Sequence, residues 1–197
     1  MEITRTLLLR NNVAMKHRRS IRLKGYDYKQ AAAYFVTVCT RGRECLFGWV
    51  TDCEMRLNDI GRKVRSAWEE LPTRFADMSL DAFIVMPNHI YGIIRVGAQF
   101  IAPHQSTPAQ EGAMNRAPTL GEIVRTYKSV STRLIRRTVN SDFAWQHNYY
   151  EHVIRDDRSL ERIRDYIVNN PARWAEDEEN PDHQAVAKSS VKSWLGS

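Results

Sequence analysis

The pattern of apolar positions predicts three short strands. Residues 34–40 are rich in β-branched and aromatic side chains, which favour an extended conformation. Two further apolar runs, 82–86 and 90–96, are separated by Pro87-Asn88, a dipeptide typical of turns. The simplest interpretation is that these two runs are buried strands joined at that turn.

Two segments show a spacing of apolar residues close to 3.6, which is the period of an amphipathic helix. The first covers residues 54–71 and ends before Pro72, because the residue before a proline avoids the helical region. The second covers about residues 158–169. Its expected buried stripe consists of Leu160, Ile163 and Ile167.

A capping signal predicts a further helix in the second half of the chain. Thr119 is followed three residues later by Glu122, the capping-box pattern that begins many helices. We expect this helix to run to about Thr138. Residues 97–118, which precede it, are interrupted by glycine and proline and show little periodicity, so we interpret them as a long surface loop.

These elements predict an α+β fold in one main domain. The strands are short, and the helices are too few to cover a parallel sheet, so an antiparallel sheet with helices packed on it is expected. The chain has 197 residues, which suits one domain with tails. We interpret residues 1–20 as a basic N-terminal arm, 21–175 as the folded domain, and 176–197 as an acidic linker and C-terminal tail.

Charge and composition narrow the function classes. The net charge is +6 and the sequence pI is about 9.4, which favours a polyanionic partner such as a nucleic acid. The chain has three cysteines and no C-x-x-C pair, which favours a reducing cytoplasm and argues against a disulfide frame or a cysteine zinc site. No apolar run approaches the length of a membrane span, so no membrane partner is expected.

The first candidate site lies just after the Pro87-Asn88 turn. Residues i and i+2 of a strand share a face, so His89 and Tyr91 project to the same side of the sheet. Two polar rings among isoleucines are unusual for a pure core. The residues by themselves leave two interpretations open, a metal or catalytic site and a hydrogen-bonded structural histidine.

The second candidate site lies on the helix expected at 158–169. Arg162, Tyr166 and Asn170 follow one another at intervals of four residues and lie on one helical face. A tyrosine can attack a phosphodiester once its phenol is deprotonated, but the free phenol has a pKa near 10 and needs a neighbouring cation or base. The alternative is that Tyr166 only borders the apolar stripe.

A third candidate is a surface for nucleic acid. In residues 145–155, aromatic and basic residues alternate, which suits stacking on unpaired bases beside a phosphate track, although core aromatics on a strand fit equally well. The N-terminal arm and the 119–138 helix add further positive charges. The candidate DNA-binding residues are Arg19, Arg22, Lys24, Arg125, Lys128, Arg133, Tyr149, Tyr150, Arg155 and Arg162.

Several blocks of the sequence together resemble one family, the REP-associated tyrosine transposases, which are relatives of the single-tyrosine HUH transposases. The blocks occur in the family's order over about residues 16–174. They are Arg19-Ser-Ile-Arg-Leu, Ala33-Tyr-Phe-Val-Thr-Val, Ala82-Phe-Ile-Val-Met-Pro-Asn-His, Trp145-Gln-His-Asn-Tyr-Tyr-Glu-His-Val-Ile-Arg and Asp165-Tyr-Ile-Val-Asn-Asn-Pro. The resemblance implies a ferredoxin-like sandwich and an enzyme that cuts and joins single-stranded DNA next to palindromic hairpins.

The resemblance also implies roles for individual residues. His89 matches the first metal-binding histidine, Tyr166 the nucleophile that forms a 5′-phosphotyrosine, and Asn170 a further ligand of Mg²⁺ or Mn²⁺. The second histidine of the motif is replaced by Tyr91. Because a phenol holds its proton to about pH 10, Tyr91 is a poor ligand compared with an imidazole.

Two alternatives remain at the level of the sequence. The protein could bind hairpin DNA with weakened or no catalysis. Tyr91, in place of the second histidine, is the feature that separates this alternative from an active transposase. It could also bind RNA, because a ferredoxin-like sheet is an RNA platform, but the aromatic signature of such sheets is not evident. Strand exchange with one tyrosine per subunit would suit a homodimer.

Overall fold

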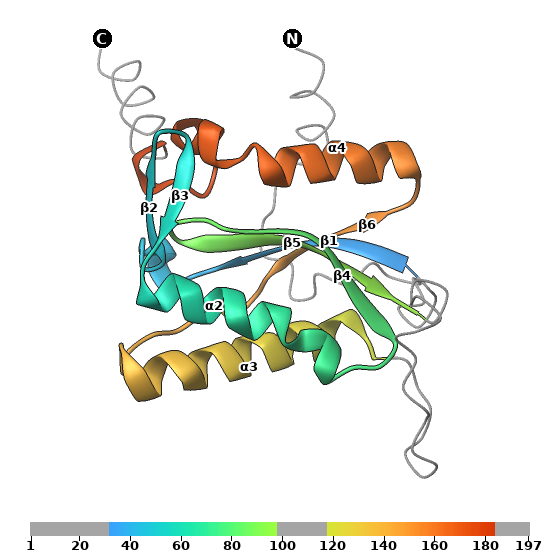
Figure 1. The fold of residues 1–197 in the computed structure, drawn as a ribbon, viewed down its shortest axis with the longest axis horizontal. Coiled ribbons are helices and arrows are strands. Elements are labelled where there is room, and N and C mark those ends of the chain that lie inside the picture. Colours follow the sequence, from blue (N-terminus) through green and yellow to red (C-terminus); the bar gives the residue numbers. More distant parts are fainter. Residues whose placement is uncertain (1–31, 98–117, 184–197) are drawn as a thin grey trace, which may run out of the picture.

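The computed structural model describes residues 32–97 and 118–183, and within them a four-stranded antiparallel sheet forms the centre (Figure 1). Its strands are β1 (Ala32–Cys39), β4 (Met78–Val85), β5 (His89–Val96) and β6 (Tyr150–Ile154), in the spatial order β4-β5-β1-β6. Helix α2 (Asp59–Glu69) connects β1 to β4 through a small hairpin, and α3 (Leu120–Thr138) connects β5 to β6. This βαββαβ order is the expected ferredoxin-like α+β fold.

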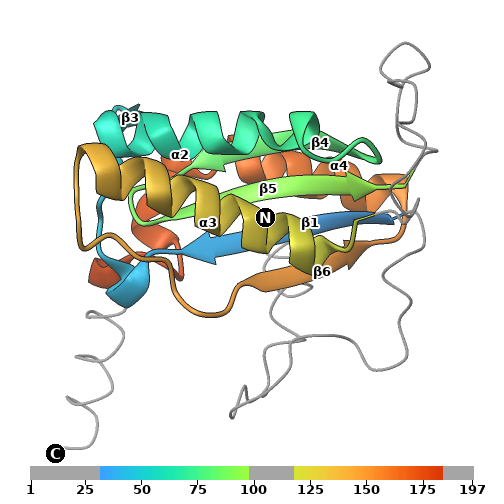
Figure 2. The same ribbon diagram turned by 90° about the horizontal axis from the view of Figure 1, so that it is seen from below.

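The helices cover the two faces of the sheet unequally. Figures 1 and 2 show α2 and α3 side by side on one face, and α4 (Asp157–Val168) on the other. Strands β2 (Gly48–Thr51) and β3 (Glu54–Leu57) pair with each other in a separate ribbon at one end of the sheet. The face under α4 holds Tyr166 of α4 together with Tyr91 of β5, and the His89 ring packs against Tyr91.

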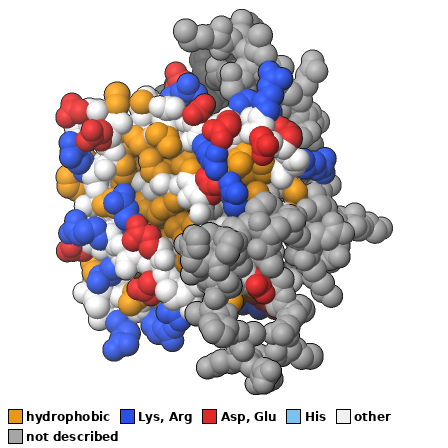
Figure 3. Space-filling model, turned by 45° about the vertical axis from the view of Figure 1, so that its right-hand side comes forward, with side chains coloured by type: hydrophobic (Ala, Val, Ile, Leu, Met, Phe, Trp, Pro, Cys, Tyr) orange, Lys and Arg blue, Asp and Glu red, His pale blue; other side chains and the backbone are white. Residues whose placement is uncertain are grey.

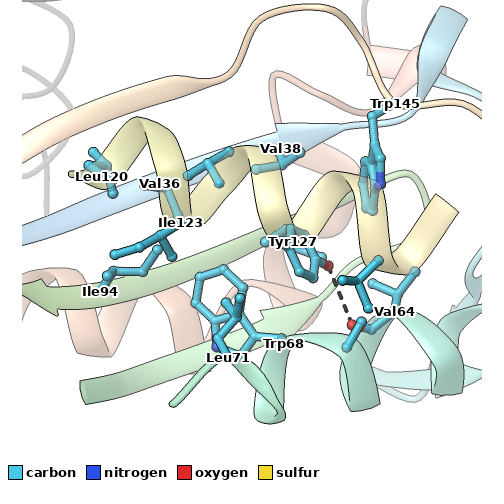
Figure 4. Close-up of a cluster of buried hydrophobic side chains, with 14 of the residues drawn as sticks. Val36, Val38, Val64, Trp68, Leu71, Ile94, Leu120, Ile123, Tyr127 and Trp145 are labelled. Carbon is cyan, nitrogen blue, oxygen red and sulfur yellow. Dashed lines mark hydrogen bonds between the residues drawn. The ribbon is translucent and has the colours of Figure 1, made fainter. Parts of the chain in front are cut away.

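Strand β1 is buried along its whole length because both of its faces are covered. Tyr34, Val36 and Val38 belong to the larger core, which packs under α2 and α3. In that core the Tyr127 hydroxyl donates a hydrogen bond to the Val64 carbonyl at 3.4 Å (Figure 4). The alternate residue Phe35 belongs to a smaller cluster under α4. Two opposed apolar layers thus hold the sheet rigid beneath the candidate site.

The predicted strands and the capping box are confirmed. The Thr119 side chain accepts from the Glu122 backbone N–H, and the Glu122 carboxylate accepts from the Thr119 backbone N–H at 2.8 Å. The turn between β4 and β5 lies at Pro87-Asn88, as predicted.

The helix predicted over 54–71 begins later than expected. Residues 54–57 form strand β3, and the Asn58 side chain caps α2 by accepting from the Gly61 backbone N–H at 2.9 Å. Asp52 and Cys53 have positive φ, which turns the chain sharply and lets β3 pair with β2. The strand pairing and the cap together override the helical spacing of Met55.

The segment that follows α4 differs from the acidic linker that was expected to begin at residue 176 outside the folded domain. A short 3-10 helix, η4 (Pro171–Glu176), leads into a turn in which Asp177 and Asn180 are each only 5% exposed. Asn88 donates to the Glu179 carbonyl at 2.7 Å, and Arg43 forms an ion pair with the Glu179 carboxylate at 3.0 Å. This part of the acidic stretch is therefore packed against the domain beside β5.

The expected basic arm at 1–20, nearly all of the 97–118 loop and the tail beyond residue 183 lie outside the described residues. Within the described ranges, none of the helices has the length and apolar character needed to cross a membrane. Cys39, Cys45 and Cys53 are all free thiols.

Candidate active site

The fold brings together the two sequence segments that were expected to carry chemistry. His89 and Tyr91 project from β5, and their rings pack edge to face with centroids 4.3 Å apart. Helix α4 crosses above them, and the Tyr166 hydroxyl donates to the Tyr91 hydroxyl at 3.1 Å. The phenol of α4 and the imidazole of β5 therefore lie on the same face of the sheet, one aromatic ring apart.

His89 is fully buried and its tautomer follows from its neighbour. The Asn88 side-chain amide donates to the carbonyls of Arg43 and Glu179, which directs its oxygen toward His89 Nδ1 at 2.7 Å. Because that oxygen only accepts, Nδ1 must carry the hydrogen. His89 Nε2 is then a bare acceptor, and it has no hydrogen-bond partner within the described chain.

The ring of His89 is also held neutral. Burial, and secondarily the positive charge of Arg43, lowers the pKa of His89 to about 3. A neutral imidazole with Nδ1 hydrogen-bonded and Nε2 free is the form in which histidine binds metal ions.

Asp177 joins this cluster from the acidic segment, and sequence reasoning missed it. Its carboxylate accepts from the Tyr91 hydroxyl at 3.1 Å and lies 3.8 Å from His89 Nε2. Burial raises the pKa of the Asp177 carboxyl, while the hydrogen bonds that the carboxyl accepts act in the opposite direction. One of several acidic residues in a polar run gives no signal of burial, so only the fold reveals it.

Asn170 completes the cluster at the end of α4. Its side chain is 2% exposed, and its Oδ1 has no hydrogen-bond partner among the described residues. The side-chain amide of Asn170 lies next to the Tyr166 hydroxyl and the Asp177 carboxylate. Its hydrogen bonds act to lower the pKa of both groups. Asn170 keeps helical angles (φ −62°, ψ −38°) despite the following Pro171, so the polypeptide continues into η4 without turning away.

Tyr166 is a partly buried phenol and is not sealed in the core. Burial raises its pKa to about 12, although the hydrogen bond to Tyr91 acts in the opposite direction. At neutral pH this hydroxyl is protonated, so nucleophilic attack requires a cation or a base close to it.

Two of the three expected metal ligands, His89 and Asn170, present atoms that could bind a divalent cation, and Tyr91 does not. His89 Nε2 and Asn170 Oδ1 are buried acceptors left without partners, which is costly unless an ion or water satisfies them. The Tyr91 hydroxyl instead donates to Asp177, and burial raises its pKa well above the ordinary value of 10. In the described ranges no three His, Cys, Asp or Glu side chains gather in a metal-binding group.

Two of the candidate DNA-binding residues, Tyr150 and Arg162, lie on the Tyr166 side of the sheet, and a third, Arg155, follows the strand that carries Tyr150. Tyr150 is 44% exposed and packs edge-on against Phe35, next to the Tyr166 ring. Arg155 is exposed just after β6. Arg162 is exposed on α4 and donates to the Ser159 hydroxyl at 3.0 Å.

Lys128 on α3 has a structural contact that the sequence did not predict. Its ammonium donates to the carbonyls of Gln146, His147 and Asn148 at 2.9, 3.2 and 2.9 Å and lies over the Tyr149 ring. Burial lowers the pKa of Lys128 to about 8. Lys128 thus holds the loop before β6 in place, and its ammonium donates its hydrogen bonds to the backbone of that loop.

An open groove runs beside α3 on the face opposite Tyr166. Arg125 and Arg133 are exposed on this helix, and Arg133 lines the groove. The other lining residues are Lys128, Ser129, Thr132, Arg136, Arg137, Ala144, Trp145, Gln146 and His147. The remaining candidates, Arg19, Arg22 and Lys24, lie outside the described residues.

The charged residues that line the groove beside α3 are all basic: Lys128, Arg133, Arg136 and Arg137. On the face shown in Figure 3, by contrast, acidic and basic side chains of the described residues are interspersed around a patch of hydrophobic ones.

Comparisons with known proteins place the chain among relatives. No family model matches it. In the solved structures, a REP-associated tyrosine transposase bound to a REP hairpin is 21% identical, with 81% of this chain and 74% of that chain covered and a TM-score of 0.49. A candidate transposase from Deinococcus radiodurans R1 is 15% identical, with 75% of this chain and 95% of that chain covered and a TM-score of 0.43.

A much stronger match comes from a curated sequence. The chain is 41% identical over 171 residues to an uncharacterized protein of Haemophilus influenzae, and the match covers 85% of this chain and 95% of that protein. Identity at this level over nearly the whole of both sequences shows common descent. The chain belongs to the same protein family as this Haemophilus influenzae protein.

Proposed function

We propose that the protein is a tyrosine transposase that nicks and rejoins single-stranded DNA beside a palindromic hairpin. The observation that carries the proposal is the Tyr166 hydroxyl, partly exposed and hydrogen-bonded to the β5 face that holds His89. The ordered sequence blocks that resemble REP-associated tyrosine transposases support it independently. The ferredoxin-like fold agrees with that resemblance.

In the proposed reaction, the Tyr166 oxygen attacks the scissile phosphorus in line. The phenol proton passes to a base or to solvent as a bond forms between that oxygen and the phosphorus. The bond to the 3′ oxygen breaks, and the 3′ oxygen leaves as a hydroxyl after taking a proton from solvent, so that no net proton is gained or lost. The product is a 5′-phosphotyrosine that keeps the energy of the phosphodiester. Rejoining to another 3′-hydroxyl therefore needs no ATP.

The residues around Tyr166 position it for this attack. Tyr91 accepts the hydrogen of the Tyr166 hydroxyl and so fixes the orientation of the oxygen, while Phe35 supports both rings from below. His89 and Asn170 would hold Mg²⁺ or Mn²⁺, which supplies polarisation of the phosphate and offsets its developing charge. The raised pKa of Tyr166 is the reason that such help is needed.

Binding of the DNA is assigned to two surfaces. Tyr150 and Arg162 lie on the Tyr166 side of the sheet, and Arg155 follows β6. There an aromatic ring can stack on an unpaired base and arginines can pair with phosphates. The groove beside α3, with Arg133, suits the phosphates of a duplex hairpin stem.

The test uses a labelled hairpin oligonucleotide with a single-stranded flank, incubated with the full chain and Mn²⁺. The wild type should yield a covalent protein–DNA band that resists denaturation. Tyr166→Phe removes only the hydroxyl, so it should abolish the band while the dissociation constant for the hairpin changes less than about twofold. Adducts that persist in Tyr166→Phe would refute the nucleophile.

A second outcome would favour the alternative considered above. Tight hairpin binding by the wild type, with no adduct under Mg²⁺ or Mn²⁺ at any pH, would identify a hairpin-binding protein without catalysis. A matched RNA hairpin that competes as well as DNA would instead overturn the choice of nucleic acid.

A further inference from the structure

The replacement of the second histidine by Tyr91 raises the question of what supplies the missing ligand. Two electron-pair donors, His89 Nε2 and the Asp177 carboxylate, lie close to each other at this point. His89 Nε2 has no hydrogen, because Nδ1 carries it, and it lies 3.8 Å from the Asp177 carboxylate. Both side chains are 0% exposed. This separation is too long for a hydrogen bond.

We propose that Asp177, carried by the segment after α4, is the anionic ligand of a divalent cation that His89 Nε2 and Asn170 Oδ1 also bind. This inference rests on the proposed function and names the residue that fills the place of the second histidine. It assigns Tyr91 a supporting role, since its hydroxyl donates to Asp177.

The geometry of the pair suits a shared ion. Two ligand atoms each about 2.1 Å from one ion lie roughly 3.0 Å apart at a right angle and roughly 4.2 Å apart when opposite. The observed 3.8 Å between His89 Nε2 and Asp177 Oδ2 falls within this range. A histidine nitrogen with carboxylate and amide oxygens is a mixed set that suits Mn²⁺, and a small ion such as Mg²⁺ completes its shell with water.

The supporting hydrogen bonds are those that orient metal ligands. Asp177 Oδ1 accepts from the Glu179 backbone N–H at 2.7 Å, which leaves Oδ2 to face the imidazole. His89 Nδ1 donates to the Asn88 side-chain oxygen, as ligating histidines usually do through their second nitrogen. Both ligands are therefore fixed before an ion arrives.

The charges around Asp177 are also consistent with a cation. Asp177 is buried, and within the described ranges its carboxylate forms no ion pair with a lysine or an arginine. The neighbouring Glu179 is already paired with Arg43 at 3.0 Å. A buried carboxylate without a positive partner is costly, and a divalent ion removes that cost.

The test measures Mn²⁺ binding to the full chain without DNA, by calorimetry and by electron paramagnetic resonance. The wild type should bind one Mn²⁺, and Asp177→Asn should weaken the dissociation constant at least about tenfold. Glu178→Gln removes the same charge from the adjacent exposed residue and should change it less than about twofold. Far-UV circular dichroism checks that both variants are folded.

A measurement on the unmutated protein keeps the test independent of folding. In protein labelled with ¹³C at the aspartate carboxyl carbons, bound Mn²⁺ should couple magnetically to a carboxyl carbon and to an imidazole nitrogen. Absence of the ¹³C coupling, an unchanged Mn²⁺ affinity in Asp177→Asn, or no Mn²⁺ binding by the wild type would each overturn the assignment.

The two proposals fail separately because this assay contains no DNA. Mn²⁺ binding that depends on Asp177 supports the assignment even if the protein forms no covalent adduct. Adduct formation through Tyr166 together with unchanged Mn²⁺ affinity in Asp177→Asn overturns the assignment alone.

Discussion

At the scale of single residues, the site depends on how the protons of a few polar groups are distributed. Asn88 uses both amide hydrogens on backbone carbonyls and so sets the tautomer of His89. The Tyr91 proton goes to the Asp177 carboxylate, which can only accept, so the Tyr166 proton points to Tyr91. The result is a buried neutral imidazole with a free nitrogen beside a protonated phenol.

We expect His89 to remain neutral, with its hydrogen on Nδ1, down to about pH 4, because burial lowers its pKa to about 3. In the unfolded chain the ring takes a proton near pH 6.5. Its contribution to stability is therefore complete above pH 6.5 and is lost as the pH falls toward 3. The raised pKa of Asp177 acts in the opposite direction, since the folded state then binds a proton more readily.

Two-dimensional ¹H–¹⁵N spectra that correlate ring nitrogens with ring hydrogens report the tautomer directly. The His89 signals should show no titration between pH 7 and pH 4. An imidazolium at pH 6, or a hydrogen on Nε2, would contradict the proton distribution.

At the scale of elements, the position of α4 relative to the sheet decides where Tyr166 lies. The register of β4 with β5 shifts between Leu80 and Phe83, and Asp81 lies in this irregularity. Its carboxylate accepts from Arg164 on α4 at 2.7 and 2.8 Å and from Arg95 on β5 at 2.5 Å. The β-bulge therefore turns a carboxylate toward the helix that carries Tyr166, the proposed nucleophile.

Asp81→Asn should lower the free energy of unfolding by about 1–3 kcal/mol, because two arginines lose their shared anion. Hydrogen bonds, above all from Arg164, lower the pKa of Asp81 to about 2, so its contribution is present above about pH 3.8 and is lost as the pH falls through 2. Urea denaturation at pH 7 measures the change. Adduct formation should also slow, since α4 loses an anchor.

Glu161→Gln is the matched control. Glu161 also pairs with Arg164, but its side chain is 64% exposed, so the free energy of unfolding should change by less than about 0.5 kcal/mol. Equal effects of the two substitutions would show that the position of Asp81 in the bulge has no special role.

Elements with local signals were predictable from the sequence, and elements defined by distant contacts were not. The capping box of Thr119 and the turn at Pro87-Asn88 are encoded within a few residues, and both were found. Strand β3 was missed because Met55 fits a helical spacing, while its pairing with β2 depends on a turn with positive φ. Asp177 was missed because burial of one carboxylate in an acidic run depends on contacts with β5, far away in the sequence.

At the scale of the whole molecule, the basic groove and the proposed nucleophile, Tyr166, lie on opposite faces of the sheet. The groove is lined by residues of α3, whereas Tyr166 belongs to α4. These two helices cover opposite faces of the sheet (Figure 1). Strand β6 forms the edge of the sheet and carries Tyr150 on the Tyr166 side. In the proposed complex, a hairpin stem held in the groove reaches Tyr166 only if its single-stranded flank crosses this edge.

Arg133→Gln should weaken hairpin binding and reduce the slope of log affinity against log salt by about 1, because one phosphate contact is lost. Covalent attack at saturating protein should be unchanged, since Arg133 is remote from Tyr166. Arg65→Gln, an equal charge change on the exposed surface of α2, should alter binding less than about twofold. Fluorescence anisotropy at several salt concentrations measures hairpin binding by both variants. Equal slopes of log affinity against log salt for Arg133→Gln and Arg65→Gln would exclude the groove as the binding surface for the hairpin.

Covalent attachment of the Tyr166 oxygen to DNA can be read out by peptide mapping. The adduct formed with a hairpin oligonucleotide is digested with nuclease and trypsin and analysed by mass spectrometry. We expect a 5′-nucleotide on the peptide of residues 165–173, attached at Tyr166. A nucleotide on any other residue, or no modified peptide when the hairpin is bound and Mn²⁺ is present, would contradict it.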